Sequence, residues 1–162
     1  MTAEKLTERL ETALLGAFDI ASVYLGDRLG FYQSLANDGP ATSTQLADRT
    51  GTAERYAREW LEQQAMTQIL RVDDPAKPAQ DRVFALPEEY EAVFVDPDSP
   101  LGMAHAAQSF VASFAPLPQL LAAYRTGAGV PYEDYGEEMA IGQARFSRPF
   151  GLHRLAGEYL PA

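Results

Sequence analysis

The sequence predicts a mainly α-helical fold with one small β-hairpin, on three observations. Apolar residues recur at spacings of three and four over most of the chain. Only two short stretches, residues 69–72 and 82–86, have the composition of strands. Prolines and glycines divide the remaining sequence into segments of helix length.

The first predicted element is a helix from Glu4 to Ala36. Gly26 and Gly30 predict a bend or a second short helix within it, and residues 37–40 form a loop by composition. The apolar stripe is too large to be stable alone in water, so we expect it to pack on the rest of the chain or on a second copy. The stripe consists of Leu6, Leu10, Ala13, Leu14, Ala17, Ala21, Tyr24 and Leu25.

Residues 42–66 have the outline of a helix-turn-helix. Thr42 or Ser43 is suited to cap the first helix, and Gly51 supplies the turn to the second. The two strands follow, with a loop at 73–81 between them, so the order of helix, helix and hairpin predicts a winged helix. The second helix has a predicted buried stripe of Tyr56, Trp60, Leu61 and Met66.

The second half predicts further helices separated by prolines. Asp98 or Ser99 is suited to cap a helix that starts near Pro100, and Pro116 with Pro118 opens the next one.

Beyond the loop at residues 128–136, a helix covers residues 137–146. Ser147 and Pro149 start a last helix that ends at Pro161. The predicted division places the N-terminal helices and the winged helix in residues 1–97 and a helical region in residues 98–162.

The charge of the chain disfavours nucleic acid as a partner. The formal net charge is −10, and residues 41–94 hold six basic and ten acidic residues where a recognition surface needs an excess of cations. Cysteine is absent, which excludes disulfides and thiolate metal sites and suits a reducing cytoplasm. No stretch has the length and hydropathy of a membrane span, so the expected location is cytoplasmic.

Two segments carry a resemblance to a known family. They are "LADRTGTAERYAREWLEQQAMTQILRVDDPAKPA" at residues 46–79 and "AYRTGAGVPYEDYGEEMAIGQARFSRPFGLHRLAGEYLPA" at residues 123–162. They resemble the N-terminal region of class I S-adenosylmethionine-dependent methyltransferases that carry a winged-helix dimerisation domain ahead of the catalytic domain. The most specific pieces are "REWLEQQA", "YRTGAGVPYEDYG" and "RPF…L…EYLP".

The resemblance implies a homodimer whose later helices form one wall of a small-molecule pocket and close over a methyltransferase domain. That catalytic domain is expected to be absent from this chain, because the one G-x-G, Gly127 with Gly129, follows a helical segment rather than a strand. S-adenosylmethionine is therefore expected as cofactor of the full-length parent and is not expected to bind this fragment, whose cofactor-binding residues are unknown. Its expected partners are a second copy, its own catalytic domain and a small-molecule substrate.

The helix predicted after Pro100 has two distinct faces. Met103, Ala107, Phe110, Val111 and Phe114 share one face, and His105 lies on the opposite face, beside Gln108 and Ala112. His105 either lines a pocket or is exposed to solvent, and solvent exposure is the favoured interpretation; His153 is treated in the same way.

Arg145 and Arg148 either anchor a carboxylate or phosphate, or pair with Glu137, Glu138 or Glu158. The aromatic residues of the second half either face a planar ligand or belong to a core. We expect no catalytic residue and no metal site in this chain. The candidates for a substrate pocket are His105, Phe110, Phe114, Tyr132, Tyr135, Met139, Phe146 and Arg148.

Two alternatives come from other classes of protein. One is a winged-helix transcription regulator that senses a ligand in an aromatic pocket. The other is a stand-alone dimerisation or scaffold protein.

Overall fold

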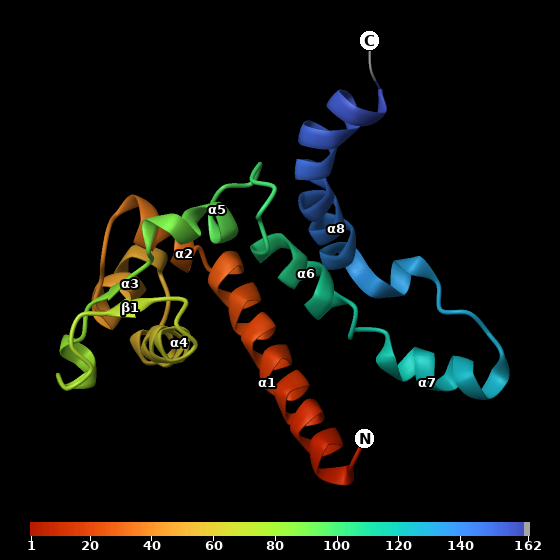
Figure 1. The fold of residues 1–162 in the computed structure, drawn as a ribbon, viewed down its shortest axis with the longest axis horizontal. Helices are drawn as coiled ribbons and strands as arrows, with labels where there is room; N and C mark the ends of the chain where they lie inside the picture. The colour runs from red at the N-terminus through yellow and green to blue at the C-terminus, as the bar shows by residue number, and fades with distance from the viewer. Residues whose placement is uncertain (161–162) are drawn as a thin grey trace.

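The computed structural model describes residues 1–160, with the side chains of residues 156–158 left out of the description. A long helix, α1 (Ala3–Arg28), runs between the winged helix on one side and α6 to α8 on the other (Figure 1). The mainly α-helical class predicted from the sequence is confirmed, and the sheet has two short strands.

The first helix breaks where the glycines predicted it. Gly30 adopts a left-handed conformation with φ 71°, which favours glycine, and α2 (Phe31–Asn37) then turns back toward the winged helix. Gly26 lies inside α1, where its lack of a side chain lets Trp60 and Tyr32 approach the helix backbone. The close packing of α1 on the winged helix therefore depends on this glycine.

The helix-turn-helix consists of α3 (Ser43–Thr50) and α4 (Glu54–Met66). Thr42 forms a capping box, in which its hydroxyl accepts from the amide of Gln45 and the Gln45 side chain accepts from the amide of Thr42. Gly51 ends α3 in the left-handed conformation, at φ 66°. Both signals were predicted from the sequence and are confirmed.

The stripe predicted for α4 was half wrong. Trp60 and Leu61 are buried, but Tyr56 is 75% exposed and Met66 is 82% exposed. The buried positions follow the spacing of three and four more closely than the aromatic and apolar residue types do, and they include a fully buried glutamine. They are Ala57, Trp60, Leu61 and Gln64.

The wing is an antiparallel pair of β1 (Arg71–Val72) and β2 (Phe84–Ala85). Arg71 lies opposite Ala85, and Val72 lies opposite Phe84. Ala41 adds an isolated bridge to Phe84, so that the segment before α3 extends the small sheet. The wing loop contains a 3₁₀ helix at Ala79–Asp81.

The core of the winged helix is one cluster of apolar side chains from α1, α2, α3, α4 and the wing. Tyr32 is fully buried within it, stacks on Phe94 with ring centroids 4.5 Å apart, and donates its hydroxyl to Gln64. The largest members are Phe31, Tyr32, Leu46, Trp60, Leu61 and Phe84.

A 3₁₀ helix (Glu88–Tyr90) and the short α5 (Glu91–Phe94) lead to α6 (Ala104–Ala112). The predicted start near Pro100 was wrong. Ser99 accepts from the amide of Leu101 at 3.1 Å in a turn, and the amide of Met103 donates to the carbonyl of Val93 at 2.9 Å. The second bond ties the chain before α6 to α5, and the helix begins at Ala104 without a side-chain cap.

The last elements are α7 (Leu117–Thr126), a 3₁₀ helix (Tyr132–Tyr135), α8 (Gly136–Phe150) and a π-helix (Gly151–Tyr159). The break predicted at Ser147 was wrong, since Pro149 lies inside α8. The wider π-helical turn follows this proline, which lacks the amide hydrogen for a regular helical bond. The predicted end at Pro161 lies outside the described residues.

Candidate functional site

A cluster of polar side chains lies where α1, α6 and α8 meet. Arg145 donates to both carboxylate oxygens of Asp27, at 2.8 and 2.9 Å, and the side chain of Asp27 is only 8% exposed. Arg145 also donates to the Oε1 of Gln108 at 2.7 Å. One guanidinium on α8 therefore binds α1 and α6 at once, in the two-pronged geometry that suits arginine and a carboxylate.

A close approach of two helices makes this geometry possible. Gly142 lies one turn before Arg145, and a Cβ at this position would come within 2.8 Å of the backbone nitrogen of Ser109. Because Gly142 has no side chain, α8 packs directly on the backbone of α6. The short distance between the helices brings Arg145 within reach of both Gln108 and Asp27.

Glu138 accepts a second group of hydrogen bonds beside those of Arg145. It accepts from the Nε2 of Gln108 at 3.0 Å, from the Tyr24 hydroxyl at 3.3 Å and from Arg28 at 3.2 Å. Gln108 is fully buried, and its amide oxygen and nitrogen each have one partner. The glutamine thus connects the Asp27–Arg145 pair to Glu138 through a buried network.

His105 lies at the edge of this cluster, and the predicted solvent exposure was wrong. The residue is 8% exposed, with Nδ1 3.8 Å from Asp27 Oδ1, and this nitrogen has no hydrogen-bond partner among the described residues. Burial lowers the pKa of His105 below its ordinary value, the positive charge of Arg145 lowers it further, and Asp27 opposes both effects. These effects together favour the neutral form of the ring.

The sequence placed His105 correctly on the face of α6 opposite Phe110 and Phe114, but it did not show which face is buried. The face of His105 and Gln108 is the buried one. Phe110 and Phe114 are 40% and 48% exposed, and their rings meet edge to face at 4.9 Å. The two phenylalanines on the larger apolar face of α6 are therefore exposed, although Ala107 on the same face is buried.

The other pocket candidates are distributed over α8 and the segment before it. Tyr132 is exposed and Tyr135 half-buried, with ring centroids 6.1 Å apart, and Met139 is half-buried on α8. Tyr135 lines a cavity of about 350 Å³ together with Gln108 and Glu138. This cavity reaches the polar cluster from the side of α8.

A second cavity, of about 430 Å³, lies between α8 and the turn before α6. Its lining includes Phe146, Pro100, Phe150 and His153. The eight candidates therefore do not converge on one pocket within the described residues.

Arg148 is held beside this second cavity by Asp98. Its Nε and Nη2 lie 2.5 and 3.3 Å from the two carboxylate oxygens. The pair lowers the pKa of Asp98 and raises that of Arg148. His153 adds a contact of 2.6 Å from Nε2 to the carbonyl of Asp98.

Of the predicted partners, neither Glu137 nor Glu138 pairs with Arg145 or Arg148 among the described residues. Arg145 binds Asp27 and Arg148 binds Asp98, whereas Glu138 pairs with Arg28. The side chain of Glu158 lies outside the described residues. Sequence spacing favours partners on the same helix, but here the partners come from α1 and from the turn before α6.

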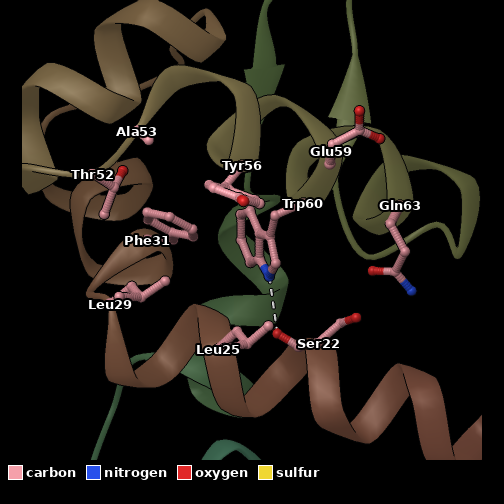
Figure 2. Close-up of a pocket in the computed structure, with 10 residues that line it drawn as sticks. All are labelled: Ser22, Leu25, Leu29, Phe31, Thr52, Ala53, Tyr56, Glu59, Trp60 and Gln63. Atoms are coloured by element: carbon pink, nitrogen blue, oxygen red, sulfur yellow. Dashed lines mark hydrogen bonds between the residues drawn. The ribbon is translucent and has the colours of Figure 1, made fainter.

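A third feature, missed by the sequence, is an apolar groove of about 560 Å³ between the end of α1 and α4. Trp60 lies at its floor and donates its indole nitrogen to the carbonyl of Ser22 at 2.9 Å (Figure 2). Tyr56 stands on the rim, which explains the high exposure of an aromatic residue in the second helix of the helix-turn-helix. The lining residues are Ser22, Leu25, Leu29, Phe31, Thr52, Ala53, Tyr56, Glu59, Trp60 and Gln63.

Residues 1–155 and 159–160, whose side chains the structure describes, contain no group of three histidine, aspartate or glutamate side chains placed to hold a metal ion. In the same range, no helix combines the length and hydropathy needed to cross a bilayer.

Comparisons with known proteins agree with the winged-helix fold. Residues 18–95 match the model of the family described as the Rv2258c-like winged HTH domain. No curated protein matches the chain significantly.

Solved structures similar to the chain include three methyltransferases. The mitomycin 7-O-methyltransferase MmcR is 25% identical, with a TM-score of 0.64 over 94% of this chain and 45% of its own. The N,N-8-amino-8-demethyl-D-riboflavin dimethyltransferase RosA from Streptomyces davawensis is 22% identical, with a TM-score of 0.65 over 93% of this chain and 45% of its own.

Human N-acetylserotonin methyltransferase, solved in complex with SAM, is 17% identical, with a TM-score of 0.63 over 90% of this chain and 43% of its own. The chain thus spans less than half the length of the three structures. The resemblance predicted from the sequence is confirmed, since the chain is similar to the N-terminal winged-helix region of such methyltransferases.

Proposed function

We propose that this chain is the dimerisation and substrate-recognition part of an S-adenosylmethionine-dependent methyltransferase that acts on a small molecule. The observation that carries the proposal is the similarity of 94% of the chain to 45% of a methyltransferase at 25% identity. In this proposal, residues 1–97 make the dimer and residues 98–162 form the wall of the substrate pocket.

The cofactor belongs to a further domain, because the residues described here do not fit it. Gly127 has φ 75° and closes α7 as its C-terminal cap, so the G-x-G at 127–129 follows a helix and not a strand. The sheet consists of two short antiparallel strands and offers no crossover at which a nucleotide could bind. The chain alone is therefore expected to be inactive and to bind no S-adenosylmethionine.

Unpartnered apolar surface supports the docking of such a domain. Phe110 and Phe114 on α6, together with Leu121 and Tyr124 on α7, expose between 40% and 86% of their area. None of the residues of α7 is buried. Apolar surface on this scale marks an interaction site, and in this proposal the catalytic domain covers it and closes the cavities beside α8 over a substrate.

Exposed apolar surface on α1 supports a homodimer. Residues 1–16 are exposed on every side, although they include Leu10, Leu14 and Leu15. A projecting helix of this length is marginal in water unless another surface covers it. In the proposed enzyme that surface is a second copy of the chain.

The geometry opposes the alternative of a DNA-binding regulator. The second helix of a helix-turn-helix normally enters the major groove, but here α4 has α1 beside it, through the bond from Trp60 to Ser22. The exposed Glu59 adds negative charge to the free part of α4. We place the protein in the cytoplasm, which a chain without cysteine suits.

The mass of the native gene product in its source cells tests the proposal. A product roughly twice the 17.7 kDa of this chain is expected, since a second domain of ordinary size is required. Isothermal calorimetry should then detect S-adenosylmethionine binding to that product and none to residues 1–162. A native mass near 17.7 kDa would overturn the proposal and favour a scaffold protein.

A further inference from the structure

The groove beside Trp60 and the exposed stripe of α1 are one continuous surface. Leu25 and Leu29 form the wall of the groove on the side of α1 (Figure 2). Leu10, Leu14 and Phe18 precede them on the same helix at intervals of four residues. All five are between 43% and 63% exposed.

The helical repeat places these side chains on one face. At about 100° per residue, the positions from Leu10 to Leu29 fall within a sector of about 100°. Ala21 belongs to the same sector and is half-buried. Arg28 and Glu11 lie at the two edges of this sector, and the side chains between them are apolar, so the middle of the sector is suited to pack against another apolar surface.

The stripe cannot fill the groove of its own chain. The helix is continuous from Ala3 to Arg28, and the rise of about 1.5 Å per residue puts Leu10 about 28 Å from Leu29 along the axis. Only the α1 of another copy can bring these leucines to the groove.

We propose that the first half of α1 from a second copy occupies this groove, in an antiparallel register that places Leu14 of one chain against Leu25 of the other. The same two-fold register places Leu10 against Leu29 and the large Phe18 against the small Ala21. Each chain fills one groove and offers one, which is the self-complementarity required of a two-fold interface. The inference rests on the homodimer in the proposed function and names the surface that forms it.

An antiparallel arrangement follows from the position of the groove at one end of the stripe. A parallel pair would place Leu14 against Leu14 and groove against groove. Both grooves would then remain unfilled, and Tyr56 would stay exposed. The antiparallel pair covers both ends of the stripe.

Cysteine cross-linking tests the register, because the chain has no cysteine of its own. The full chain with Leu14→Cys is mixed with the full chain with Leu25→Cys under mild oxidation, and each variant is also oxidised alone. The mixture is expected to form a species of twice 17.7 kDa. Each variant alone is expected to stay uncross-linked, since the two copies of residue 14 lie about 16 Å apart along the axis and a disulfide needs Cα atoms within about 7 Å.

The matched control mixes Leu6→Cys with Leu25→Cys. Leu6 is eight residues from Leu14, so it lies about 12 Å out of register and should not cross-link. Sedimentation equilibrium of the unmodified chain at micromolar concentration provides the mass without any cross-link. All the substituted side chains are at least 37% exposed, so the variants are expected to fold.

The outcomes separate this inference from the homodimer. Cross-linking in the mixture alone supports the antiparallel register. Cross-linking of each single variant alone shows a parallel pair and overturns the register, while the homodimer stands. A dimer mass without any cross-link overturns the proposal that α1 of the second copy occupies the groove. A monomer mass in every experiment overturns both this proposal and the homodimer.

Discussion

Arg145 on α8 donates two hydrogen bonds to Asp27 on α1, although 118 residues separate them in the sequence. The pair is one of few polar connections between the first helix and the last, and Asp27 Oδ1 lies 3.8 Å from the Nδ1 of His105. Together with the bonds to Glu138, this pair joins α1, α6 and α8.

Replacing Arg145 by methionine should destabilise the chain by about 2 kcal/mol, because the carboxylate of Asp27 stays buried without its partner. The expected loss is below that of a fully buried pair, since the side chain of Arg145 is 32% exposed. Urea denaturation measures the change. Arg71→Met is the matched control, because the Arg71–Glu89 pair is exposed on both sides and should contribute less than about 1 kcal/mol.

Removing the carboxylate of Asp27 as well should recover part of the stability that is lost in Arg145→Met. In the double variant Asp27→Asn with Arg145→Met, no unpaired carboxylate remains at the site, so the two single losses should not add. Simple additivity of the single losses would contradict the coupling of the two residues.

The stability of the chain should fall as the pH falls below about 6.5, through His105. Its folded pKa is below the ordinary 6.5, because burial and Arg145 disfavour the charged ring. The unfolded chain therefore binds the proton first, and the free energy of unfolding decreases between pH 6.5 and the lower folded pKa. Chemical denaturation at pH 7.5, 6.5 and 5.5 measures this dependence.

The contribution of His105 can be isolated with glutamine variants. His105→Gln should make the free energy of unfolding less dependent on pH over this interval. His153→Gln retains His105 and should leave the pH dependence unchanged. Equal slopes for the native chain and for His105→Gln would show that the histidine does not link stability to pH.

Two glycines of α1 should respond to alanine in opposite directions. A Cβ on Gly26 would meet Trp60 and lie 2.5 Å from Tyr32, so Gly26→Ala should cost about 2 kcal/mol by overpacking. Gly16 has no atom within 4 Å of the added Cβ, so Gly16→Ala should stabilise by about 0.5 to 1 kcal/mol through helix propensity. Thermal unfolding followed by the fluorescence of Trp60 gives both values, and a loss at both positions would contradict the packing described here.

The exposed aromatic face of α6 should be dispensable for the folding of this chain. Phe110→Ser and Phe114→Ser should each change the free energy of unfolding by less than about 1 kcal/mol, because both rings are already 40% or more exposed. Binding of a hydrophobic dye should decrease in both variants. By contrast, Leu46→Ala should cost about 2 to 4 kcal/mol, because Leu46 is fully buried.

Local signals in the sequence predicted much of the winged helix correctly. Thr42 and Gly51 act through bonds and dihedral angles within a few residues of themselves, so their roles can be read without the fold. The glycine break at the end of α1 is of the same kind. The confirmed elements are therefore those whose cause is local.

The errors concern long-range packing. The sequence shows that α6 has two faces, but a partner outside the chain can cover either one, and here the smaller face with His105 is buried within the chain. The same reason applies to Tyr56, whose aromatic side chain predicts burial but lies on the rim of the groove. The partners of Arg145 and Arg148 come from distant segments, which no spacing along α8 indicates.

The long helix α1 behaves mechanically as a lever. Its second half is fixed at two places, by Trp60 on one side and by Arg145 on the other, whereas its first sixteen residues are all exposed. A rotation of about 10° at the fixed half displaces a tip about 30 Å away by about 5 Å, at 1.5 Å of rise per residue. A small change in how Arg145 binds Asp27 is therefore expected to displace the first residues of α1 more than the site itself.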